Sequence, residues 1–238
     1  MTEILINYTD FYAMSQNLPK YINLITQIKT VALGTISIIL LGSYFISIVF
    51  TMQVMKEFVH FNASSIIGGT LANIYIRELS PVITAVILTG KVASAFTAEI
   101  AIMKVTKQLD AMCVMNTSPI SYLIIPRVLA CCIVLPLLNI LSFLASLSNS
   151  MLISALFYNI SVVVFRESIC WSTILIDGYK SLAKSVIFAV IMSIISCYFG
   201  LTAINDTKGV GLTITSSVVI ILMLIFTVNF ILSYLIFY

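Results

Sequence analysis

The chain has 238 residues, of which 61% are hydrophobic and 9% are charged, with a formal net charge of +3. So few polar side chains cannot coat a soluble globule, and the composition therefore predicts an integral membrane protein. The small and dispersed positive charge gives no indication of a nucleic-acid partner.

The first predicted element is an N-terminal segment, residues 1–30, which we expect to lie along the membrane interface. Its stretch YINLITQIK places Tyr21, Ile25 and Ile28 on one helical stripe, as an interfacial helix requires. A frayed tail outside the membrane is the alternative. The beginning carries Glu3 and Asp10 and lacks a basic region before its first apolar residues, so it resembles neither a signal peptide nor a transit peptide.

The remainder, residues 31–238, is predicted to form one transmembrane bundle, and the whole chain, 1–238, is predicted to be a single domain. Each of its nearly uncharged stretches reaches the roughly 20 apolar residues that a bilayer requires. They are residues 31–55, 79–103, 120–157, 185–204 and 212–238. This predicts an all-α membrane protein with about five spanning helices. The third stretch is long enough that a sixth crossing stays open.

The second span carries charge inside its apolar run. Ser80 before Pro81 is typical of a capped helix start, so we expect this span to begin near residue 81. Lys91 then lies about 15 Å along the helix, near the middle of the bilayer, and Glu99 lies near its exit. A lysine at that depth costs about 2.5–3.5 kcal/mol and should face protein or water, with snorkelling as the alternative.

The two charged residues of this span, Lys91 and Glu99, lie too far apart along the helix to pair with each other, so we expect their partners on other helices. Small residues accompany them and predict a face for close helix packing. They are Gly90, Ser94, Thr97, Ala98 and Ala101.

Past Met103 the pattern becomes amphipathic. Val105, Leu109 and Met112 keep helical spacing, while polar side chains take the other side. No helix breaker precedes the NTSP stretch at 116–119, which predicts that the helix continues from the membrane to about residue 115. Such a segment can lie passively on the membrane or be held by a soluble partner.

The residues of this region resemble the MlaE-type permeases, the membrane subunits of ABC transporters that move phospholipids in bacteria and chloroplasts. The similarity rests on RELSPVITAVILTGKVASAFTAEIAIMKVTKQLDAM from residue 77, PRVLA at 126–130, GYKSLAKSVIFA at 178–189, CYFGL at 197–201 and GVGLTITSSVV at 209–219. The chain departs from that family's pattern at Ser80, Lys91, Ala93, Lys107 and Asn229, where the family usually has Gly, Arg, Gly, Glu and Asp.

The resemblance implies that residues 104–115 are a coupling helix seated on a separate ATP-binding subunit. The coupling residues would be Lys104, Val105, Thr106, Lys107, Gln108, Leu109, Asp110 and Met112. Since Gly90-Lys91 lacks both the upstream Gly and the following Ser or Thr of a phosphate-binding loop, we expect no cofactor in this chain, with ATP bound by the partner. The resemblance also implies a permease homodimer, a lipid substrate and a substrate-binding partner of the MCE type.

Two other function classes were weighed. A secondary transporter could use Lys91 and Glu99 as a proton relay. An enzyme is disfavoured because the only histidine, His60, has no companion at the spacing of a catalytic or metal site, so no catalytic and no metal-binding residues are predicted. The five cysteines are expected to be small buried hydrophobic residues. Abundant Ile, Asn, Tyr and Lys suggest an AT-rich genome and favour a plastid inner envelope membrane, with a bacterial inner membrane as the alternative.

Overall fold

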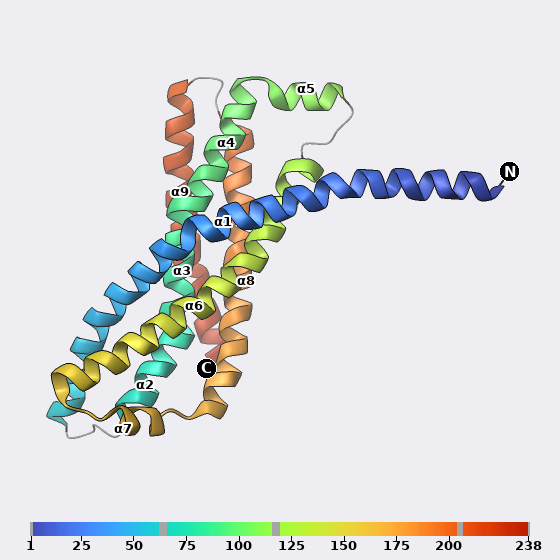
Figure 1. Cartoon of the computed structure of the whole chain (residues 1–238). Helices are drawn as coiled ribbons and strands as arrows, with labels where there is room; N and C mark the ends of the chain where they lie inside the picture. Colours follow the sequence, from blue (N-terminus) through green and yellow to red (C-terminus); the bar gives the residue numbers. More distant parts are fainter. Residues whose placement is uncertain (1, 62–65, 116–119, 204–206, 238) are drawn as a thin grey trace.

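The computed structural model describes residues 2–61, 66–115, 120–203 and 207–237, and every regular element in these ranges is helical (Figure 1). The elements are α1 (Thr2–His60), α2 (Ile67–Ile74), the π-helical segment η2 (Tyr75–Leu79), α3 (Ser80–Leu88), the π-helical η3 (Thr89–Ala93), α4 (Ser94–Val105), α5 (Gln108–Val114), the π-helical η4 (Ile120–Ile124), α6 (Ile125–Tyr158), α7 (Val162–Glu167), α8 (Trp171–Thr202) and α9 (Thr207–Phe237).

Five helical stretches are long and apolar enough to cross a membrane: Leu24–His60, Ile67–Val105, Tyr122–Tyr158, Thr173–Thr202 and Gly209–Leu235. The predicted five-span, all-α architecture is confirmed. The third apolar stretch forms one long helix, and α7 after it has six residues, too few to cross a bilayer. Over the described residues there is therefore no sixth crossing.

The predicted start of the second span is wrong. The helix begins at Ile67 and runs through Ser80 and Pro81, and Ser80 does not cap it. A proline has no N–H to donate to the preceding turn of an α-helix. The π-helical turn η2, directly before Ser80, lets the helix continue past Pro81. Ser80 instead uses its hydroxyl across the bundle. It lies 2.7 Å from both the backbone and the side-chain oxygen of Asn139 on α6.

The first helix is continuous from Thr2 to His60. Figure 1 shows its N-terminal part leaving the bundle at a steep angle to α8 and α9, and the interfacial position of residues 1–30 stays a prediction. The C-terminal part packs along α6 and is joined to it by hydrogen bonds. The side-chain amide of Asn149 donates a 2.9 Å hydrogen bond to the carbonyl of Tyr44 and a 2.6 Å hydrogen bond to the hydroxyl of Ser47. Interhelical hydrogen bonds of this kind hold helices together where lipid removes the hydrophobic driving force.

The two ends of the bundle differ. α5 lies at one end, together with the start of α9, and α7 lies at the other (Figure 1). At the α7 end, Gly68 and Gly69 approach the backbone of Phe165 and Ser168, where any side chain would collide. The buried core between these ends is one apolar cluster from five spans, which includes Ile39, Leu88, Leu135, Phe188 and Ile225.

Candidate functional site

A buried charge cluster joins the second, fourth and fifth spans. Glu78 on η2 accepts hydrogen bonds from three side chains: its Oε1 lies 3.2 Å from Lys184 Nζ and 2.7 Å from Ser233 Oγ, and its Oε2 lies 3.0 Å from Asn229 Nδ2. The Lys184 side chain is 0% exposed, whereas that of Glu78 is 39% exposed. The carboxylate is thus fixed by α8 and α9 and remains accessible from one side.

The neighbouring Arg77 turns to a different partner. Its Nε lies 2.6 Å from Asp177 Oδ2 on α8, and Lys180 Nζ lies 3.9 Å from the other oxygen of Asp177. Adjacent residues on a helix do not face each other, so Arg77 and Glu78 form two separate ion pairs. Together the two pairs connect the second span to α8 at two points.

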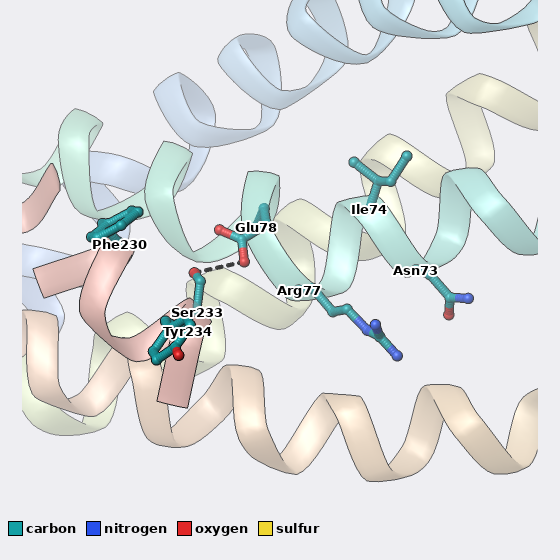
Figure 2. A pocket seen from close by; sticks show the side chains of 7 residues that line it. All are labelled: Asn73, Ile74, Arg77, Glu78, Phe230, Ser233 and Tyr234. Carbon is teal, nitrogen blue, oxygen red and sulfur yellow. Dashed lines mark hydrogen bonds between the residues drawn. The ribbon is translucent and has the colours of Figure 1, made fainter. Parts of the chain in front are cut away.

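These side chains border a cavity of about 470 Å³ between the second span and the end of α9. It is lined by Asn73, Ile74, Arg77, Glu78, Phe230, Ser233 and Tyr234. Figure 2 shows Glu78 turned toward Ser233, while Arg77 extends away from that contact. The volume lies in the range of small-molecule sites, and the lining combines charged groups with aromatic and aliphatic surface.

The cavity offers both polar and apolar groups to a ligand. In the part of the chain that the structure describes, no three His, Cys, Asp or Glu side chains gather at one place to hold a metal ion. The polar groups of the cavity are an amide, a guanidinium, a carboxylate and two hydroxyls. Such a set can hold an amphipathic molecule by its polar end while Ile74 and Phe230 contact its apolar part.

Lys91 and Glu99 both find partners on other helices, as predicted. The ammonium of Lys91 donates to the backbone carbonyl of Gly34 on α1. Glu99 pairs with Arg127 at the start of α6, with 2.7 Å between Oε2 and Nη2. The two predicted residues therefore do not meet each other, which removes the simplest form of a proton relay between them.

The predicted packing stripe divides into two parts. Thr97 and Ala101 are fully buried, and Thr97 Oγ1 lies 3.1 Å from the carbonyl of Ser196 and 3.1 Å from the hydroxyl of Ser217. Ser94 and Ala98 are half-buried. Gly90 is exposed, and a side chain built there would contact nothing within 4 Å. Only one edge of the stripe packs inside this chain.

The continuous helix predicted for residues 104–115 is wrong at its middle. Lys104 and Val105 complete α4, Thr106 and Lys107 form a corner in which Lys107 adopts a left-handed φ of 57°, and α5 begins at Gln108. Residue types alone gave no sign of the break, because lysine carries no strong preference for this conformation. The other predicted coupling residues, Gln108, Leu109, Asp110 and Met112, lie on α5.

The short helix α5 has one face toward the bundle and one toward its surroundings. Leu109 is buried with Ile100 and Cys197, whereas Asp110 is exposed and Val114 is 88% exposed. Leu109 is therefore part of this chain's own core. The face available to another protein is the one that carries Asp110 and Val114.

Sequence reasoning missed the members of the charge cluster and the partner of Glu99. Lys184, Asp177, Asn229 and Ser233 lie about 100 or more positions from their partners in the second span. Arg127 stood next to Pro126 in a recognised motif but was given no role. The one available signal was chemical: ionisable residues in apolar spans are rarely without partners.

Comparison with known proteins places these features in a family. The profile described as "Permease MlaE" matches residues 24–235. A probable ABC transporter permease protein, ycf63, from Pyropia yezoensis is 46% identical over 215 residues, which cover 90% of this chain and 82% of that protein. A probable ABC transporter permease of Synechocystis sp. is 43% identical over the same shares of both chains.

A third relative comes from Arabidopsis thaliana and is named "Protein TRIGALACTOSYLDIACYLGLYCEROL 1, chloroplastic". It is 38% identical over 211 residues, which cover 89% of this chain and 60% of the Arabidopsis protein. The range matched by the family profile, residues 24–235, includes the second span, the residues that line the cavity and α5.

Proposed function

This chain belongs to the MlaE permease family and is an ABC transporter permease, and we propose that it moves phospholipid, driven by a separate ATP-binding subunit. The observation that carries the proposal is the cavity between the second span and α9, in which charged and apolar groups stand side by side. A lipid has the same division between a polar headgroup and apolar chains.

The charged pair at the cavity indicates how a headgroup would bind. Arg77 and Glu78 each have side chains that are 39% exposed, although both are held by ion pairs. A guanidinium recognises phosphate through charge-assisted hydrogen bonds, and a carboxylate accepts from an ammonium or a hydroxyl. Glycerophospholipids carry both kinds of group. The Arabidopsis relative is named after a lipid, trigalactosyldiacylglycerol, and this name also supports a lipid substrate.

The proposed ATP-binding subunit would hold α5. This helix stands at one end of the bundle, and its outward side combines Asp110 with the apolar Val114 and Met115, which are 88% and 69% exposed. Apolar side chains outside the membrane-spanning helices are exposed to water unless another surface buries them. A groove on a soluble partner protein can bury them. Naming of the relatives as ABC transporter permeases supports such a partner.

The remaining partners follow from the family resemblance. We place a second permease copy against the exposed apolar side of α9, where Leu212, Met223 and Phe230 are 70%, 67% and 75% exposed. A substrate-binding protein of the MCE type would stand at the end that carries α7. Relatives from Porphyra purpurea and Arabidopsis chloroplasts support a plastid inner envelope, and the Synechocystis and Rickettsia relatives support a bacterial inner membrane as the alternative.

Reconstitution of the permease with its ATP-binding subunit tests the proposal. We expect ATP to drive relocation of a fluorescent phosphatidylglycerol in vesicles, and we expect Ile74→Trp, which fills the cavity, to reduce relocation per ATP. Leu152→Trp on the exposed side of α6 is the matched control and should change little. Relocation that needs a proton gradient but no ATPase would overturn the proposal and favour a secondary transporter.

A further inference from the structure

A buried arginine links the second and third spans at the end of the bundle that carries α5. Arg127 is 2% exposed and lies near the start of α6. Its Nη2 lies 2.7 Å from Glu99 Oε2, and its Nη1 donates a 3.3 Å hydrogen bond to the carbonyl of Phe96. Its guanidinium carbon lies 5.0 Å from the centre of the Phe96 ring. All three contacts are to α4.

A second contact ties α4 to α8 at the same depth. Lys104 Nζ donates a 2.6 Å hydrogen bond to the carbonyl of Leu201, which lies one residue before the end of α8. The last carbonyls of a helix have no partner within it, so this ammonium satisfies a group that α8 itself cannot. Gly200 allows the approach, because a Cβ there would lie 2.7 Å from Ile100 Cβ and 3.2 Å from the carbonyl of Thr97.

The short helix α5 rests on this junction. Leu109 packs with Ile100 of α4 and Cys197 of α8, and Met103, Leu123 and Leu201 surround them. A displacement of α5 therefore presses on α4 and α8 together. The contact between α4 and α6 at this end joins Arg127 to the apolar packing of Phe96, whereas α6 packs along α1, α3 and α8 over the rest of its length.

We propose that Arg127 is a positioning residue that holds α6 to α4, so that α4, α6 and α8 move as one rigid unit when α5 is displaced. This inference rests on the proposed ATP-driven function. An arginine stays charged, and burial makes loss of its counter-ion costly. Among the described residues Glu99 is its only ion-pair partner, and Nε of Arg127 has no hydrogen-bond acceptor. α6 therefore follows α4.

A native cysteine and one introduced on α6 allow a test that needs neither lipid nor ATPase. Cys113 on α5 is exposed, as is Leu137 on α6, while Cys131 and Cys197 are buried. Spin labels on Cys113 and on the cysteine of Leu137→Cys, in a background with Cys132→Ala and Cys170→Ala and with unlabelled permease in excess, report the distance between α5 and α6. We expect a narrow distribution for the parent protein and a broad one for Arg127→Met and Glu99→Gln.

The functional arm uses the complex with the ATP-binding subunit and measures relocation of fluorescent phosphatidylglycerol per ATP hydrolysed. We expect Glu99→Gln and Arg127→Met to lower this ratio by roughly three- to tenfold with ATPase binding retained, as substitutions within a coupling network do. The double variant should be no worse than Arg127→Met alone, because both remove one interaction. Glu99→Asp should restore most of the ratio.

Lys56→Met is the matched control, since Lys56 is an exposed cation on α1 that has no part in the charge cluster or the cavity. Unchanged distances and ratio in Glu99→Gln and Arg127→Met, or an equal effect of Lys56→Met, would overturn the assignment of Arg127. If ATP moves no lipid in the parent complex while the label distances still broaden in the variants, the proposed transport fails and the rigid unit stands.

Discussion

Lys184 on α8 donates a hydrogen bond of 3.0 Å to the carbonyl oxygen of Arg77 in the second span. Arg77 lies four residues before Pro81, and a proline has no N–H to offer to the preceding turn. The same ammonium lies 3.2 Å from Glu78 Oε1 and 2.8 Å from Ser233 Oγ. Lys184 therefore fills a gap in the hydrogen bonding of another helix while it neutralises a carboxylate.

Lys184→Met should lower the free energy of unfolding by about 2–3 kcal/mol. Removal of one partner of a fully buried ion pair costs about 3–5 kcal/mol, and the partial exposure of Glu78 reduces that cost. Denaturant unfolding of the detergent-solubilised permease measures the change. Lys180→Met, which removes a half-exposed cation from the same helix, should stay within about 0.5 kcal/mol of the parent.

Substitutions at adjacent positions of α5 should separate binding from folding. Asp110→Lys places the opposite charge on the exposed face, so we expect weaker co-purification of the ATP-binding subunit with unchanged thermal unfolding. Leu109→Ala removes a buried side chain and should lower permease stability by about 2–3 kcal/mol. Full co-purification with Asp110→Lys would show that this face does not bind the subunit.

Lys91→Met should leave membrane insertion intact and reduce lipid relocation severalfold. The ammonium donates to the carbonyl of Gly34, so its loss removes a tie between the second span and α1. Gly34→Ala is a useful control, because the added methyl group would meet Lys91 Nζ at 3.6 Å, an ordinary contact. Unchanged relocation in Lys91→Met would show that transport does not need the tie between Lys91 and Gly34.

Two glycines should respond in opposite ways to alanine. Gly200→Ala forces α4 and α8 apart and should destabilise the protein by about 1–3 kcal/mol, since overpacking strains a filled core. Gly211→Ala, on α9 with open space around it, should stabilise by about 0.5–1 kcal/mol because it removes backbone freedom from the unfolded chain. Melting temperatures of the two variants give the comparison directly.

Hydropathy and spacing located the spans because the bilayer imposes length and composition on each helix independently. The helix ends were harder to predict. Ser80-Pro81 has the pattern of a helix start, yet the second span begins at Ile67, since the wide turn at Tyr75–Leu79 accommodates the proline. The corner at Lys107 was missed because no residue there demands it.

The polar interior of the bundle could be predicted only in part. An ionised side chain in an apolar span implies a partner, and this was enough to predict that Lys91 and Glu99 would reach other helices. Which residues they reach depends on how the helices pack. Glu78 binds Lys184 and Asn229, which lie more than 100 positions away, and no sequence pattern links it to either residue.

The two wide turns in the second span, Tyr75–Leu79 and Thr89–Ala93, bear on whether the helix can lose one residue and keep its packing. Each is what an α-helix becomes when it absorbs one surplus residue without rotating the pieces on either side. Deletion of a single codon inside Thr89–Ala93 should therefore tighten that turn into regular winding and leave Glu99 facing its present partner, whereas at Tyr75–Leu79 Pro81 opposes the same tightening. The same deletion in α3 would swing every later side chain of the span by about 100°.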